Sequence, residues 1–114
     1  MRRYVLTLDL KDDVSLIAEY EQWHREVWPE VEQSILASGI RRMEIYRFSN
    51  RLVMILDADE QFSFERKAMV DEANPHVQEW ERLMWKYQQP VPGAKQGEKW
   101  TIMNKIFEIS GNGV

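Results

Sequence analysis

Residues 41–58, RRMEIYRFSNRLVMILDA, restrict the possible folds more than any other segment of the chain. Polar and apolar side chains are interspersed in residues 43–48, before Ser49-Asn50, and residues 52–56, after it, are a short apolar run. Both patterns are typical of β-strands, and two polar residues between two such runs predict a tight hairpin. We therefore expect strands at residues 41–48 and 51–58. A chain built around this hairpin contains an antiparallel sheet.

Strand-like and helical segments alternate around the hairpin. The predicted strands are residues 4–10 and 98–109, and the predicted helices are residues 14–27, 29–38, 63–73 and 75–88. Asp12 or Asp13 and Asn74 are suitable N-caps, and Gly39 is suited to end the second helix. Residues 90–97, PVPGAKQG, are expected to be a loop. The order β-α-β-β-α-β predicts an α+β, ferredoxin-like fold, with helices on one face of a four-stranded antiparallel sheet.

Both faces of the predicted sheet carry apolar or aromatic side chains. In residues 41–48, Met43 and Ile45 alternate with Tyr46 and Phe48. Helices cover one face only, and an open sheet face with this much apolar surface requires a cover. A second copy of the chain is the simplest one, so we expect a homodimer in which two sheets face each other as a dimeric α+β barrel. Residues 1–110 are expected to form the single domain, and residues 111–114 to fray.

Composition excludes several classes of protein. The net charge of the 114 residues is −4, so the chain has no basic surface for nucleic acid. No apolar run is long enough to cross a membrane, and the N-terminus lacks the pattern of a signal peptide, so a cytoplasmic location is expected. Without cysteine there are no disulfides. PGAKQGEK, residues 92–99, lacks the spacing of a phosphate-binding loop, and neither a cofactor nor a metal is expected.

The predicted first helix places a histidine on its apolar side. Trp23, Tyr20 and His24 lie on the inward stripe, whereas the charged residues of this helix lie outside it. Tyr20 is one turn before His24. One interpretation is that His24 is a hydrogen-bonded core residue. The other is that it lines a pocket, where an imidazole can give and take a proton near neutral pH. The spacing fits both interpretations.

The predicted last helix offers two further candidates. Trp80 shares an apolar face with Met84 and Tyr87, and it is either a core residue or a flat wall against which a ligand stacks. His76 follows Pro75 at the start of the helix and is expected to be exposed. The sequence places no three or four ligands where they would converge on a metal.

The segment EYEQWHREVWPEVEQ, residues 19–33, resembles the signature of the L-rhamnose mutarotase family. The signature consists of tyrosine, three residues, histidine, three residues and Trp-Pro-Glu. In this chain these are Tyr20, His24 and residues 28–30. The resemblance continues through the hairpin and HVQEW, residues 76–80, and covers nearly the whole chain. It implies a dimeric ferredoxin-like barrel that interconverts the α and β anomers of 6-deoxy-L-sugars without a cofactor.

The resemblance also implies roles for individual residues. The proton-transferring histidine corresponds to His24, and two sugar-contacting positions correspond to Tyr20 and Trp80. Met43 stands where the rhamnose enzymes tend to have tyrosine, and Glu81 stands where they have a second tryptophan. Both changes lie at substrate-binding positions, and they make the chain similar to members of the family associated with L-fucose. L-fucose and L-rhamnose differ in hydroxyl orientation at ring carbons 2 and 4.

Mutarotation requires a proton to reach the ring oxygen while another leaves the anomeric hydroxyl, and histidine suits this exchange. The second proton-transfer group stays open between Tyr46, Glu81 and a bound water. Two alternatives to a mutarotase also stay open. One is a cofactor-free monooxygenase or haem-degrading enzyme on the same barrel, and the other is a non-catalytic module that binds a ligand or forms dimers.

Overall fold

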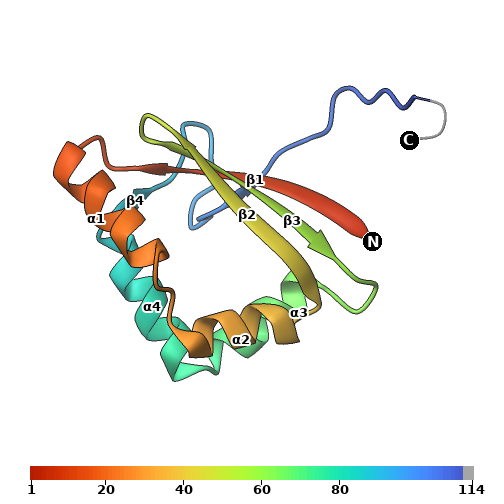
Figure 1. Cartoon of the computed structure of the whole chain (residues 1–114), viewed down its shortest axis with the longest axis horizontal. Helices are drawn as coiled ribbons and strands as arrows, with labels where there is room; N and C mark the ends of the chain where they lie inside the picture. Colours follow the sequence, from red (N-terminus) through yellow and green to blue (C-terminus); the bar gives the residue numbers. More distant parts are fainter. Residues whose placement is uncertain (112–114) are drawn as a thin grey trace.

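The computed structural model of the chain describes residues 1–111. Its helices and strands follow one another in the order β1 (Arg2–Leu10), α1 (Val14–His24), α2 (Pro29–Ala37), β2 (Ile40–Phe48), β3 (Arg51–Ala58), α3 (Phe64–Glu72), α4 (Pro75–Trp85), β4 (Gln88–Gln89) and β5 (Thr101–Ile102). The helices lie on one side of the sheet and leave its other face open (Figure 1). This arrangement confirms the predicted ferredoxin-like α+β fold. The predicted fraying of residues 111–114 falls almost wholly outside the described residues.

The sheet is antiparallel, with the strand order β2-β3-β1-β4, and β5 also pairs with β1. The hairpin of β2 and β3 turns at Ser49-Asn50 as predicted, with Phe48 opposite Arg51. Side chains alternate between the two faces of each strand. Leu6 and Leu56 therefore lie on the helix side, whereas Val53 and Ile55 lie on the open side, between β1 and β2.

The predicted fourth strand, residues 98–109, is wrong for most of its length. Only Thr101–Ile102 pairs with β1, and one further bond joins the Met103 amide to the Val5 carbonyl at 2.8 Å. Continuing this register would place Lys105 opposite Arg3, and like charges directly opposite are destabilising. The segment beyond Ile102 leaves the sheet (Figure 1).

The last helix is shorter than predicted, and a strand takes its expected end. α4 ends at Trp85, and Gln88–Gln89 pair with Asp9 and Leu10 of β1 as β4. Beyond the end of α4, Tyr87 and Gln88 are both buried, in contact with β1 and α1. The sheet edge expected from residues 98–109 is therefore shared by two very short strands.

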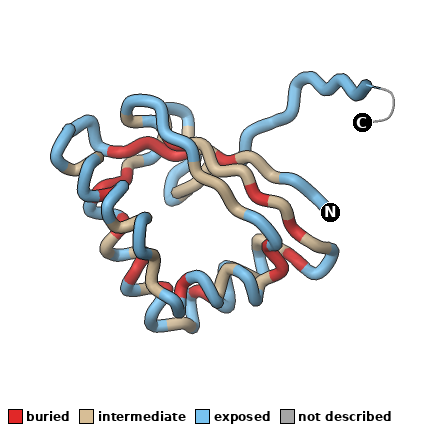
Figure 2. The backbone as a smooth tube through the Cα atoms, viewed as in Figure 1, coloured by how far each residue is buried: buried red, intermediate tan, exposed pale blue. Residues whose placement is uncertain are grey.

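Two clusters of buried side chains hold the helices on the sheet. One joins Tyr20, Trp80 and Tyr87 to the ends of β1 and β3, and the other surrounds Ile40 and Phe62. In Figure 2 buried positions follow both the sheet and the inner side of the helical layer. α4 packs against both α2 and α3, so the helices form one continuous layer. This layer and the sheet enclose the candidate site.

Candidate active site

A cavity of about 590 Å³ lies between the sheet and the helical layer. Cavities of this size are typical of small-molecule sites, in which an apolar lining carries a few polar groups. The structure brings all the predicted site residues together here: the cavity is lined by His24, Tyr20, Trp80, Met43 and Glu81. The roles of these residues stay a prediction.

Helical spacing explains how α1 and α4 present their site residues. Tyr20 and His24 are four residues apart on α1, and their rings lie 4.3 Å apart. On α4 the cavity is lined by Val77, Gln78, Trp80, Glu81 and Met84, which share one face of the helix. Met43 completes the opposite wall from β2, where it faces Leu56 of β3.

The end of α1 determines the environment of His24. α1 ends at His24, three residues before the predicted Val27, and Trp28, which precedes Pro29, adopts an extended conformation. The His24 ring lies in this last turn, and its Nδ1 is 2.9 Å from the Tyr20 carbonyl oxygen. A carbonyl only accepts hydrogen bonds, so Nδ1 carries the proton of the neutral ring. Nε2 therefore keeps its lone pair.

Burial favours the neutral form of the His24 imidazole. The side chain is half-buried, and this burial lowers its pKa, although the bond to the Tyr20 carbonyl opposes the shift. At neutral pH the ring is therefore unprotonated at Nε2. A neutral imidazole that lines a cavity is chemically able to take a proton from a bound hydroxyl.

Tyr20 is a protonated hydrogen-bonding group at the same end of the cavity. Burial raises the pKa of its phenol to about 12, opposed by the hydrogen bond from Gln88. The Gln88 Nε2 donates to the Tyr20 hydroxyl oxygen at 3.4 Å. The phenol proton is therefore available for another acceptor. The Gln88 Oε1 is buried and has no hydrogen-bond partner among residues 1–111, so its carboxamide is only half satisfied.

Aromatic rings hold Trp80 in place. Its ring centroid lies 5.1 Å from that of Trp28, 5.6 Å from that of His24 and 6.4 Å from that of Trp23, each in an edge-to-face arrangement. Trp23 is itself tied by its Nε1, which donates to the Tyr87 hydroxyl at 3.0 Å. The histidine thus lies among aromatic side chains because the same stripe of α1 contacts both the core and the cavity.

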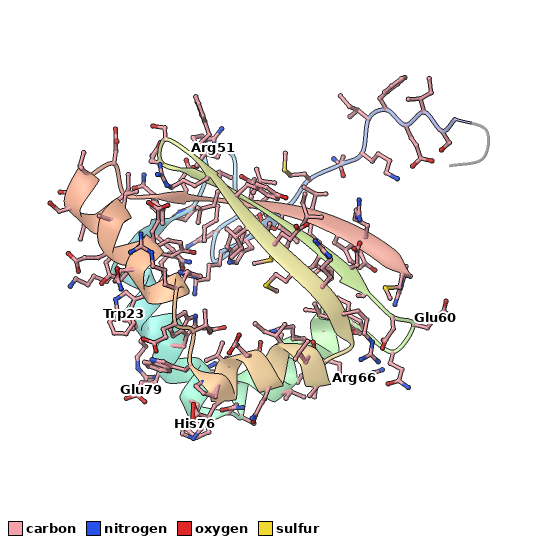
Figure 3. The ribbon with its side chains drawn as sticks, in the orientation of Figure 1. Trp23, Arg51, Glu60, Arg66, His76 and Glu79 are labelled. Atoms are coloured by element: carbon pink, nitrogen blue, oxygen red, sulfur yellow. The ribbon has the colours of Figure 1, made fainter. Side chains whose placement is uncertain are left out.

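Two residues considered from the sequence lie away from the cavity. Tyr46 is on the open face of the sheet, 55% exposed, with its hydroxyl 3.4 Å from Glu44. It has the opposite orientation to Met43 because side chains alternate along β2, and this removes it as the second proton-transfer group of its own chain. His76 is exposed, as predicted, on the outer side of the helical layer (Figure 3).

Among the polar residues of the cavity that sequence reasoning missed are Gln88 and Lys99. Gln88 was expected at a helix end and Lys99 at the start of a strand, and neither belongs to a periodic pattern. Within residues 1–111, no group of three or more acidic or histidine side chains could hold a metal ion. In the same part of the chain, every helix is too short or too polar to span a bilayer.

Comparison with known proteins decides the family. A sequence model of L-rhamnose mutarotase matches residues 3–109. The chain belongs to the L-rhamnose mutarotase family. This confirms the resemblance found in the sequence, and it decides between the enzymes considered there in favour of the mutarotase, an isomerase acting on sugar anomers.

Individual proteins that are similar to this chain support the family assignment. It is 46% identical to an L-fucose mutarotase of Xanthomonas campestris over 112 residues, which is 96% of this chain and 90% of that protein. Its structure is similar to the crystal structure of an L-rhamnose mutarotase from Formosa agariphila, with a TM-score of 0.71, 17% identity and coverage of 96% and 100%. It is also similar to tetracenomycin F2 cyclase from Streptomyces glaucescens, with a TM-score of 0.63, 18% identity and coverage of 97% and 99%. The two structural similarities support the fold.

Proposed function

We propose that this protein interconverts the α and β anomers of a 6-deoxy-L-hexose and prefers L-fucose. The observation that supports the chemistry best is His24, a neutral imidazole lining a cavity with Tyr20 and Trp80 beside it. The preference for L-fucose rests on the 46% identity to the L-fucose mutarotase. It also rests on Met43 and Glu81, two positions of the cavity that differ from the usual rhamnose enzymes.

In the ring-opening step His24 acts as general base. Its Nε2 takes the proton of the anomeric hydroxyl while the bond between C1 and the ring oxygen breaks and the ring oxygen gains a proton. The product is the open aldehyde. After rotation about the C1–C2 bond, the C5 hydroxyl attacks the other face of C1 and gives its proton back to the group that supplied it, while the imidazolium returns its proton to the aldehyde oxygen. Since Tyr46 lies outside the cavity, Glu81 and a bound water are the groups left for the ring oxygen.

Tyr20 and Trp80 position the sugar. The Tyr20 phenol accepts from Gln88 and stays protonated near neutral pH, so it donates a hydrogen bond to a sugar oxygen. The Trp80 indole is rigidly packed and offers a flat surface to the C–H face of the pyranose and its C6 methyl group. A fixed pose next to His24 is what proton transfer at one carbon requires.

Saturation-transfer NMR on a panel of free sugars tests the proposal. L-fucose, L-rhamnose, D-galactose and D-glucose are each mixed with the protein, and transfer between their α and β anomeric signals is measured against the uncatalysed rate. We expect faster exchange for L-fucose than for L-rhamnose, by about 10-fold or more. No acceleration with any sugar would contradict a mutarotase, and a faster reaction with L-rhamnose would contradict the preference.

The expected homodimer uses the open face of the sheet. Its centre is apolar and half-buried in the single chain, with Val5, Val53 and Ile55 beside the exposed Tyr46. Ion pairs flank this centre, Arg3 with Asp57 at one end and Arg51 with Asp9 at the other. A patch that carries both signs of charge around an apolar centre is suited to self-association about a two-fold axis. A cytoplasmic location also stays a prediction.

Replacing Val53 by lysine is expected to separate the dimer. The ammonium would enter the apolar centre of the interface, where burying a charge costs free energy. Light scattering after size exclusion should give twice the 13.7 kDa chain mass for the unmodified protein and the mass of one chain for Val53→Lys. Glu60→Lys, at the exposed turn after β3, is the matched control and should remain dimeric (Figure 3). A monomeric unmodified protein would contradict the dimer.

A further inference from the structure

Lys99 is a half-buried cation that lines the same cavity as His24 and Glu81. Its Nζ lies 5.0 Å from the ring centroid of Trp85, which supports the side chain from the last turn of α4. Within residues 1–111, no carboxylate oxygen lies within 4.0 Å of this ammonium and none accepts a hydrogen bond from it. Burial lowers the pKa of Lys99, and the negative charge of Glu81 opposes this effect.

Two other lysines of this protein, unlike Lys99, form ion pairs with carboxylates. Lys67 also lines the cavity, but it forms an ion pair with the buried Asp71. Lys86 lies outside the cavity, 5.5 Å from the ring centroid of Tyr87 and 3.6 Å from Glu19. Lys99 has the same type of aromatic support as Lys86 and no comparable carboxylate. The donors of its ammonium are therefore available to a ligand in the cavity.

Glu81 is the nearby group of opposite charge, and it too has unused capacity. Its one hydrogen bond among the described residues comes from the Gln78 Nε2 at 3.5 Å, to Oε2. Glu81 and Lys99 line the same cavity, and their charged atoms are more than 4.0 Å apart, so they do not form an ion pair. A hydroxyl group both donates and accepts a hydrogen bond. One hydroxyl between the two side chains would accept from Lys99 and donate to Glu81.

We propose that Lys99 is a substrate-binding residue and that, together with Glu81, it binds one ring hydroxyl of the sugar and so determines which sugar is accepted. The inference rests on the proposed function. A hydroxyl held between two charged groups must point in one direction, because an epimer would leave both charges unpaired in a partly buried site. Lys99 thus adds a positively charged group to a cavity whose other predicted contacts are Trp80 and Glu81 of α4.

Kinetics of Lys99→Met on L-fucose test this role. The methionine keeps the length and apolar contacts of the side chain and removes the ammonium. We expect KM to rise about 10- to 100-fold, since a hydrogen bond to a charged group is lost, and kcat to stay within about 3-fold. Lys86→Met is the matched control, because Lys86 combines the same kinds of neighbour outside the cavity, and its KM should not change.

Deoxy sugars identify the hydroxyl and separate binding from a merely structural effect. Both proteins are compared on L-fucose lacking the hydroxyl at C2, C3 or C4. For one of these sugars, the unmodified protein and Lys99→Met should have the same KM, because the bound hydroxyl is already absent. Three results would overturn the inference. Lys99→Met could raise KM by the same factor for all three deoxy sugars, it could leave KM for L-fucose unchanged, or it could lower kcat alone. If the unmodified protein accelerates no sugar at all, the proposed function fails first.

Discussion

Replacing His24 by alanine is expected to slow anomer exchange by about 10²- to 10⁴-fold, the usual contribution of a general acid or base. The substitution removes the Nε2 lone pair from the cavity. The fold should persist, because His24 is only half-buried and its one polar contact is to a carbonyl of its own helix. Saturation-transfer NMR on L-fucose measures the exchange rate, and circular dichroism verifies the fold.

His76→Ala is the matched control for this result. It removes the only other histidine, which is exposed at the start of α4 on the outer side of the helical layer (Figure 3). Exchange should be unchanged in this variant. A folded His24→Ala protein with undiminished exchange would exclude His24 as the proton-transfer group and leave Tyr20, Glu81 or a bound water.

The pH profile provides a second readout of the same group. His24 acts as a base only when neutral, and burial lowers its pKa below the ordinary value of about 6.5. Exchange catalysed by the protein should therefore be constant near pH 7 and fall as the pH drops through this lowered pKa. A midpoint above about 6.5, or a profile that is the same in His24→Ala, would contradict the assignment.

The parts of the fold that depend on local chemistry were predictable from the sequence. Asp13 caps α1 by accepting hydrogen bonds from the amides of Ser15 and Leu16, and Asn74 does the same for α4. The hairpin turn and the two inward side chains of α1, Tyr20 and His24, follow from spacing alone. In each case the interacting groups are within a few residues of one another.

The fourth strand could not be predicted in the same way. KIFEI, residues 105–109, has the β-branched and aromatic residues of a strand, but a strand requires a partner, and the composition does not say which one. In the single chain, Ile106, Phe107 and Ile109 are exposed. Gln88 and Lys99 were missed for a related reason: they enter the cavity through pairing and loop contacts with distant segments. The orientation of Tyr46, by contrast, was already implied by its alternation with Met43.

Replacing Gly39 by alanine is expected to have the largest effect on stability. It follows the C-cap of α2 with φ at +102°, a conformation that costs other residues about 1–2 kcal/mol. A Cβ at this position would lie 2.6 Å from the Asp59 Oδ1 and 3.2 Å from the Phe62 amide nitrogen. The Asp59 carboxylate would have to move, although it accepts from the Gln61 amide at 2.9 Å and pairs with Arg41 at 2.6 Å. Gly39→Ala should therefore lower the free energy of unfolding by about 2–4 kcal/mol.

Gly93→Ala separates the two causes of this loss. Gly93 has a similar φ of +92°, but a Cβ there meets no atom within 4 Å. Its substitution should cost only the conformational part, about 1 kcal/mol. Urea unfolding of both variants measures the free energies, and the difference between them is the cost of displacing Asp59 at the point where α2 passes into β2. Because β2 carries Met43 into the cavity, Gly39→Ala should also weaken anomer exchange, whereas Gly93→Ala should not. Equal losses of stability in the two variants would show that the close approach at Asp59 contributes nothing.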